Sequence, residues 1–285
     1  MGKKWAILKS VFYSRMNEEA VGLEIRNQPF RITPEDSVAY ARACEDTNPA
    51  YKAEDGALVH PLFASRILKD GLEEILLSPR VEANMIKLVH AEQSFQWHKP
   101  LRVGMELVPV SRISAIRDVS SGQVLDIDVA LEEAGKAIVS GRSSMFVRCP
   151  PKKGAKRTKE PYPFEPEMEA LSTFTVLRDQ PGRYAAASGD YNPIHTNALV
   201  AKLAGFERPI AHGLCVMAMT ARELIAAYGE GDPASLKKIA LRFSKPVYPG
   251  KDLTVKSIRG GKIQFVVELK PGKRAISNGQ AEFGR

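Results

Sequence analysis

The chain has 285 residues, of which 44% are hydrophobic and 26% charged, and its formal net charge at pH 7 is +8. This composition excludes an intrinsically disordered chain, because it supplies enough apolar residues to fill one large core or two ordinary ones. The basic excess favours anionic partners such as nucleic acid, a lipid surface or phosphate-bearing substrates, although a solvated basic surface explains it equally well.

Cysteine usage and hydropathy narrow the class of protein further. Cys44, Cys149 and Cys215 are widely spaced and form no C-x-x-C motif, which argues against a disulfide framework or a thiolate zinc site. A reducing, cytoplasmic location fits best. No apolar run approaches the roughly 18 residues that a membrane-spanning helix needs. The basic segment 3–15 lacks the composition of a transit peptide, so we interpret it as an ordinary N-terminal extension.

The sequence contains an internal duplication. Residues 40–51 and 184–195 share Tyr, Ala, Ala, Asp, Asn and Pro in the same register. Residues 97–107 match residues 243–253 in the same way, and between these anchors His60-Pro61-Leu62 corresponds to His212-Gly213-Leu214. Three anchors in one order predict two copies of a single domain, and the second copy carries an insertion before its His-Gly pair.

The duplication predicts a first domain at residues 1–149, a linker at 150–165 and a second domain at 166–285. The linker is rich in Pro, Gly and Lys and has no apolar period, which is typical of a solvated connection. A phosphate contact by its basic residues is the alternative interpretation.

The first copy begins with a short strand and a helix. The alternating residues 30–32 predict the strand. Thr33 is an N-cap candidate and Pro34 occupies the first helical position of a helix that runs to about Cys44. A longer helix is expected from Pro61, because its apolar residues recur at spacings of three and four. Strands are then expected at 89–97, 107–116, 123–132 and 137–148.

The second copy repeats this order. A strand is expected at 174–177, a short helix at 181–188, and a long helix from Gly213 to Tyr228 with Gly229 as its C-cap. Further strands are expected at 239–243, 253–258, 263–269 and 274–283. Each copy therefore predicts an α+β unit, in which an antiparallel sheet wraps a long central helix, and two such units can pair their sheets side by side.

The segment 188–195 carries the most informative chemistry. Turn-forming residues surround Asp190 and His195 and place both on one tight loop. A carboxylate and an imidazole on such a loop can share a water molecule, because His195 can move a proton near neutral pH while Asp190 accepts the second hydrogen of the water. The alternative interpretation of the same pattern is a structural turn with a capping Asp and a surface His.

Gly213 lies at the predicted start of the long helix, where free amides and the positive dipole end would stabilise a thioester oxygen that gains negative charge. The first copy keeps Asp46 but has Tyr51 in place of His195, and Pro61, which has no N–H, in place of Gly213. We therefore expect the first copy to be catalytically silent and its freed space to hold an acyl chain.

The segment from Tyr184 to His195, with Ala201, Gly205-Phe206 and 210–213, resembles the signature of the MaoC-like hydratases, also called hydratase 2 or (R)-specific enoyl-CoA hydratases. The resemblance implies a double hotdog fold and reversible syn hydration of a trans-2-enoyl thioester to a (3R)-3-hydroxyacyl thioester. It implies Asp190 and His195 as the catalytic pair and Gly213 as the oxyanion donor. It also places the chain in fatty acid metabolism.

Other assignments follow from the same pattern. Ser188, Asn192 and His212 are expected to support the loop or contact the substrate. The five histidines show no metal-ligand spacing, so we expect no metal, and hydration needs no redox cofactor. The expected partner is an acyl-CoA or acyl carrier protein, with no nucleic acid and no membrane, for a monomeric pseudo-dimer or a homodimer. A hotdog thioesterase and a non-catalytic acyl-binding or assembly subunit are the alternatives.

Overall fold

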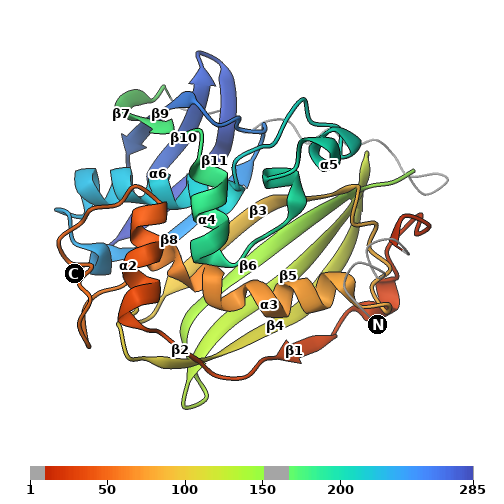
Figure 1. Ribbon diagram of the computed structural model, residues 1–285, viewed down its shortest axis with the longest axis horizontal. Helices are drawn as coiled ribbons and strands as arrows, with labels where there is room; N and C mark the ends of the chain where they lie inside the picture. Colours follow the sequence, from red (N-terminus) through yellow and green to blue (C-terminus); the bar gives the residue numbers. More distant parts are fainter. Residues whose placement is uncertain (1–9, 151–166, 285) are drawn as a thin grey trace.

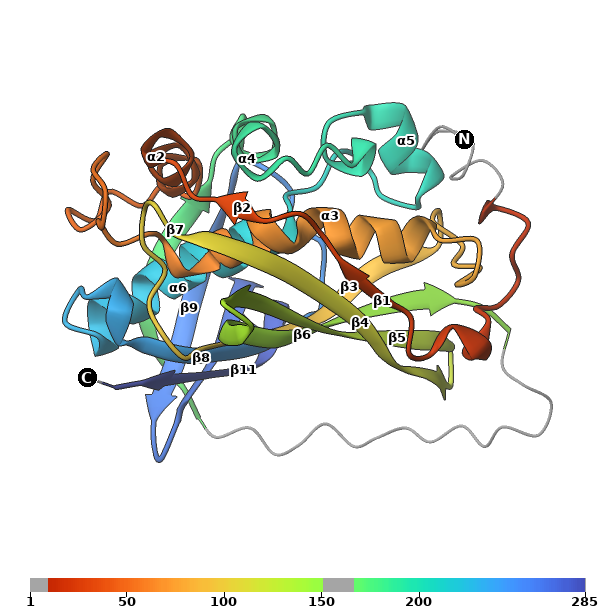
Figure 2. The ribbon, with the colours of Figure 1, turned by 90° about the horizontal axis from the view of Figure 1, so that it is seen from below.

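The computed structural model describes residues 10–150 and 167–284, so all but the first residue of the predicted linker at 150–165 lie outside the described part of the chain. Eleven strands form one antiparallel sheet, and the helices all lie over one of its faces (Figures 1 and 2). Among the described residues, no helix combines the length and apolar character needed to cross a membrane.

The two halves share a core series of elements: strand, short helix, long helix and four further strands. The first comprises η1 (Glu18–Ala20), β1 (Glu24–Arg26), β2 (Phe30–Arg31), α2 (Pro34–Ala43), η2 (Pro61–Phe63), α3 (Ala64–Leu77), β3 (Leu88–Trp97), β4 (Glu106–Val119), β5 (Gly122–Glu133) and β6 (Lys136–Arg148). The second comprises β7 (Glu169–Val176), α4 (Gln180–Ser188), η3 (Pro193–His195), α5 (Ala198–Leu203), α6 (Gly213–Tyr228), η4 (Pro233–Ser235), β8 (Leu236–Phe243), β9 (Lys251–Arg259), β10 (Ile263–Lys270) and β11 (Lys273–Phe283).

The predicted helix boundaries are confirmed where the sequence carries capping signals. The hydroxyl of Thr33 accepts a hydrogen bond from the amide of Asp36 at 3.1 Å, and Pro34 opens α2. In the second half α6 ends at the predicted C-cap, Gly229. The expected strand at 174–177 is found as β7, which begins earlier because residues from Glu169 on also pair with β9, and which ends at Val176.

The strand order explains how the two halves join. It runs β1-β4-β5-β6-β3-β8-β11-β10-β9-β7, so each half contributes a contiguous block and the blocks meet at β3 and β8. These two strands pair antiparallel, with Ser94 opposite Ala240. The halves are thus related as two copies side by side, and the chain has the double hotdog fold.

The helices form two layers over the sheet. The central helices α3 and α6 lie directly on it, and α2, α4 and α5 lie above them (Figure 2). Buried apolar residues form one cluster that runs through both halves, and its largest fully buried side chains include Phe63, Phe95 and Phe265. The insertion of the second copy includes α5, which has no counterpart in the first half.

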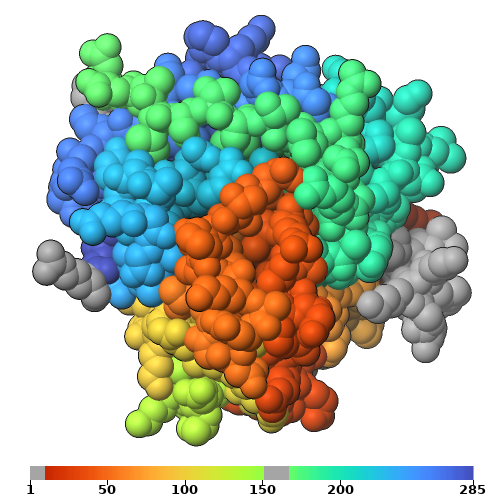
Figure 3. All heavy atoms as spheres, turned by 60° about the vertical axis from the view of Figure 1, so that its left-hand side comes forward, coloured from red at the N-terminus to blue at the C-terminus, as the bar shows by residue number. Residues whose placement is uncertain are grey.

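The second helical layer makes contacts between the two halves. Tyr40 of α2 and Tyr184 of α4 occupy matching positions of the duplication, and their buried hydroxyl oxygens lie 3.2 Å apart. The loop after α2 contacts the second half, since the side-chain amide of Asn48 donates to the carbonyl of Gly231 at 2.7 Å. Figure 3 shows the atoms of this region (orange) directly against those of the second half (green and light blue).

Candidate active site

The loop that follows α4 is built from local hydrogen bonds. Gly189 adopts a left-handed conformation with φ of 72°, which favours glycine and turns the chain out of the helix. The amide of Asp190 then donates to Ser188 Oγ at 3.2 Å, and the amide of Asn192 donates to Asp190 Oδ1 at 3.1 Å. The side chain of Asn192 in turn accepts from the amide of Ile194. Ser188 and Asn192 therefore support the loop, and Asp190 Oδ1 is held in place.

His195 ends the short helix η3 and is buried, with 8% of its surface exposed. Its Nδ1 lies 2.9 Å from the carbonyl oxygen of Ile210. Because a carbonyl oxygen can only accept, Nδ1 carries the proton and the neutral ring keeps its lone pair on Nε2. Burial lowers the pKa of His195 from its ordinary value of 6.5, against the opposing effects of Asp190 and the Ile210 carbonyl. A neutral His195 can therefore accept a proton through Nε2.

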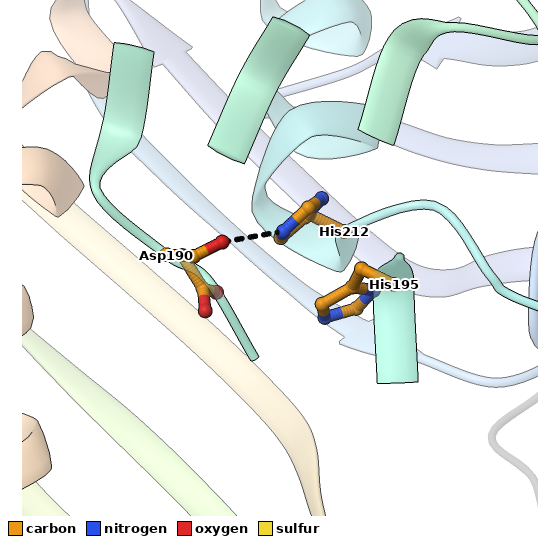
Figure 4. A group of neighbouring side chains, drawn as sticks. All are labelled: Asp190, His195 and His212. Atoms are coloured by element: carbon orange, nitrogen blue, oxygen red, sulfur yellow. Dashed lines mark hydrogen bonds between the residues drawn. The ribbon is translucent and has the colours of Figure 1, made fainter. Parts of the chain in front are cut away.

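His212 lies face to face with His195. Their ring centroids are 3.7 Å apart and their planes differ by 25°. His212 Nε2 lies 3.0 Å from the backbone oxygen of Asp190, so it donates to that carbonyl. Burial is the main cause that lowers the pKa of His212 to about 4, and the positive charge of a protonated His195 lowers it further. The stacked rings are therefore both neutral near pH 7. Figure 4 shows one ring nitrogen of His195 pointing toward Asp190.

The same three side chains bring potential metal ligands together, since ligand atoms of Asp190, His195 and His212 lie within 4.8 Å of one another. Metal-bound imidazoles point their lone pairs at one ion from about 2.0–2.1 Å. In a stack the in-plane lone pairs instead run alongside each other, and one nitrogen of each ring already donates to a carbonyl. The arrangement fits a shared water and proton transfer better than it fits a metal ion.

The start of α6 adjoins this group through His212. His212 occupies the N-cap position, but its side chain accepts no hydrogen bond from the helix. The amides of the first turn, beginning with Gly213, therefore have no side-chain cap, and Gly213 is only partly buried. A Cβ on Gly213 would lie 3.0 Å from the ring of Phe243 in β8, so glycine leaves room between helix and sheet. Uncapped amides at the positive end of a helix can bind an oxygen that gains negative charge.

The first half also contributes residues that sequence reasoning did not assign to the site. His90 of β3 packs edge to face on Phe243, with ring centroids 5.1 Å apart, and burial lowers its pKa to about 4 while Asp190 opposes the shift. Arg66 and Lys69 of α3 lie beside the loop that carries Asp190, because a Cβ on Gly189 would be 3.3 Å and 3.1 Å from their side chains. No local sequence signal marks these three residues, since only the pairing of the two halves brings them here.

The equivalent group in the first half is differently arranged. His60 Nε2 lies 3.5 Å from Asp46 Oδ2, and its Nδ1 accepts a hydrogen bond from the amide of Leu62 at 3.1 Å. The Tyr51 ring lies 5.7 Å from His60, where the second half has two stacked imidazoles. Pro61 opens the helical segment without an amide hydrogen. This half therefore has neither a free imidazole base beside its carboxylate nor an open first amide.

Comparisons with known proteins agree with this architecture. Residues 155–277 match the family described as MaoC like domain, and residues 19–140 match the FAS1-like dehydratase domain region. The crystal structure of a MaoC-like dehydratase from Phytophthora capsici superposes with a TM-score of 0.81 at 23% identity, covering 94% of this chain and 98% of that one.

Two curated relatives extend the comparison. The chain is 34% identical to the mouse peroxisomal multifunctional enzyme type 2 over 76% of its own length, but it spans only 30% of that enzyme. It is 27% identical to the Arabidopsis thaliana protein named enoyl-CoA hydratase 2, peroxisomal, over 81% of this chain and 79% of the relative. With both halves matched to dehydratase families and the double hotdog architecture shared, this chain belongs to the MaoC-like dehydratase family.

Proposed function

We propose that the protein catalyses the reversible hydration of a trans-2-enoyl thioester to a (3R)-3-hydroxyacyl thioester. One arrangement carries the proposal: His195 keeps its lone pair on Nε2, ligand atoms of Asp190, His195 and His212 lie within 4.8 Å of one another, and His212 immediately precedes the uncapped start of α6. A base, an acceptor for water and an oxyanion donor are what this reaction requires. The name of the Arabidopsis relative, an enoyl-CoA hydratase, supports the same chemistry.

The reaction follows from the roles of three groups. The thioester oxygen accepts a hydrogen bond from the Gly213 amide, and a water molecule lies between Asp190 and His195. His195 Nε2 removes a proton from this water, the water oxygen bonds to C3, and the electron pair of the C2–C3 double bond moves to the thioester oxygen. The protonated His195 then returns the proton to C2, so one water molecule is added in total. Dehydration is the reverse sequence.

The nature of the carrier and the role of the first half belong to the same proposal. Arg66 and Lys69 lie beside the Gly189 turn, and positive charge there favours a thioester carrier that bears phosphate, either coenzyme A or acyl carrier protein. The first half holds the acyl chain, since its own catalytic positions are replaced. All three cysteines are free and buried, which suits a reducing compartment such as the cytoplasm. The reaction uses no redox cofactor.

Replacing either member of the catalytic pair should nearly abolish hydration. We expect Asp190→Asn and His195→Gln each to lower kcat/KM for crotonyl-CoA by about 10²–10⁴-fold, because each removes a proton acceptor. The rate is measured as the loss of enoyl absorbance. Asp46→Asn is the matched control, since it makes the same change at the equivalent carboxylate of the first half, and it should keep activity within about twofold.

Full activity in the Asp190 and His195 variants would contradict these roles. Release of free thiol from an acyl-CoA, without loss of enoyl absorbance from crotonyl-CoA, would instead assign the site to thioester hydrolysis.

The role of the Gly213 amide can be tested by comparing a substitution that removes its hydrogen with one that keeps it. Pro is well tolerated at the first position of a helix, and His212 before it has the extended conformation that a following Pro requires. We expect Gly213→Pro to lower kcat by about 10²–10³-fold because the donor is lost. Gly213→Ala is the control, since it adds the same Cβ against Phe243 but keeps the amide. Equal losses of activity in both variants would mean that space, and not the hydrogen bond, matters there.

The pH dependence should reflect the buried base. Because burial lowers the pKa of His195 below 6.5, the ring stays neutral and active at a pH where an exposed histidine is half protonated. We expect the acid decline of kcat/KM of the wild-type enzyme to reach its half-point below pH 6.5. A decline that is already half complete above pH 7 would contradict a neutral, buried base.

A further inference from the structure

The two halves use the histidine before their central helical segment in opposite ways. His60 caps its own helix, because its Nδ1 accepts a hydrogen bond from the amide of Leu62 at 3.1 Å. His212 occupies the matching position before α6, yet its side chain accepts no bond from that helix. A histidine at the equivalent position therefore caps the helical segment of the first half and leaves that of the second half uncapped.

The imidazole of His212 is directed to the catalytic loop instead. Its Nε2 donates to the backbone oxygen of Asp190, one face stacks on His195, and the Tyr184 ring centroid lies 5.0 Å away. The ring is 2% exposed, and within the described residues its Nδ1 has no hydrogen-bond partner. It is locally unfavourable to leave the buried Nδ1 of His212 unpaired while the nearby amides of α6 are uncapped. Such losses of local stability are expected where function requires them.

We infer that His212 is a positioning residue of this site, which fixes the Asp190 loop against the His195 ring and, by leaving α6 uncapped, keeps the first helix amides open for the thioester oxygen. The inference rests on the proposed hydration reaction. The Nε2 of His212 is committed to the Asp190 carbonyl, so this nitrogen positions the loop and does not donate to substrate.

The roles of His212 can be separated by two substitutions. Asn is among the best N-cap residues, so in His212→Asn the side chain should accept the amide of Leu214 or Cys215, as His60 accepts that of Leu62. Its oxygen would then stand in front of the first helix turn, where the thioester oxygen has to reach the Gly213 amide. The smaller side chain also removes the stack and lets water reach His195. His212→Phe keeps an aromatic ring of similar shape against His195 but cannot donate to Asp190. His60→Asn is the matched control, because Asn can keep the existing cap of η2.

The ionisable groups around the stack define the pH response. Asp190 follows α4, Tyr184 lies on α4, His195 ends η3, and His90 faces the site from β3. Neither substitution changes these four residues. Burial is the largest cause of the lowered pKa of His195, so exposure of its ring in His212→Asn should raise that pKa and move the acid limb of kcat/KM to higher pH.

The experiment compares the full-length wild type with the three variants by thermal unfolding, by kcat and KM for crotonyl-CoA across pH, and by NMR titration of the His195 ring nitrogens. We expect His212→Asn to unfold at the wild-type temperature or above, with kcat lowered about 10²-fold and the acid limb moved up. His212→Phe should lose about tenfold in kcat and keep the wild-type acid limb. His60→Asn should match the wild type in kcat.

Two results would overturn the inference: wild-type kcat in both His212 variants, or losses of kcat that only follow losses of folded protein. If His212→Asn fails to fold, His212→Phe and the NMR titration decide the question. A wild type that hydrates no enoyl thioester would refute the proposed function instead. In that case the inference fails only if the pKa and tautomer of His195 are unchanged in both His212 variants.

Discussion

The hydrogen bond from His195 Nδ1 to the carbonyl of Ile210 determines what this site can do. Because the carbonyl has no hydrogen to give, the neutral imidazole must keep its proton on that side and present a lone pair on the other. Burial then holds the ring neutral, and the Asx turns of the loop bring the carboxylate of Asp190 to the same space. In the proposed reaction, backbone geometry would therefore prepare His195 as the base before any substrate arrives.

The duplication places two similar folds in one chain, and their equivalent sites differ at a few residues. Both halves place a carboxylate and a histidine beside the start of a central helical segment. In the first half His60 caps that segment and Pro61 removes its first donor, so no amide is left to bind an oxyanion. What the first half keeps is its contact with the second, through Asn48 and the β3–β8 pairing, which brings α3 and His90 to the active loop.

Sequence patterns predict the elements and the duplication well, because their signals are local: the Thr33 cap, the Gly229 C-cap and the apolar spacing along α6. They also identify Asp190, His195 and Gly213 as one group, through the turn residues and the resemblance to a known signature. The His195–His212 stack and the missing cap of α6 depend on side-chain rotamers. His60 and His212 occupy equivalent positions, but their side chains take different orientations. The approach of His90 depends on strand pairing between residues far apart in sequence, and no local pattern encodes it.

A crystal structure of the Asp190→Asn variant with a bound (3R)-3-hydroxyacyl-CoA tests the central claim most directly, because the slow variant should preserve the ligand. The thioester oxygen should lie within hydrogen-bonding distance of the Gly213 amide, and the 3-hydroxyl should face His195 Nε2 and residue 190. A thioester bound beside Asp46 in the first half, or a 3-hydroxyl directed away from His195, would contradict the account.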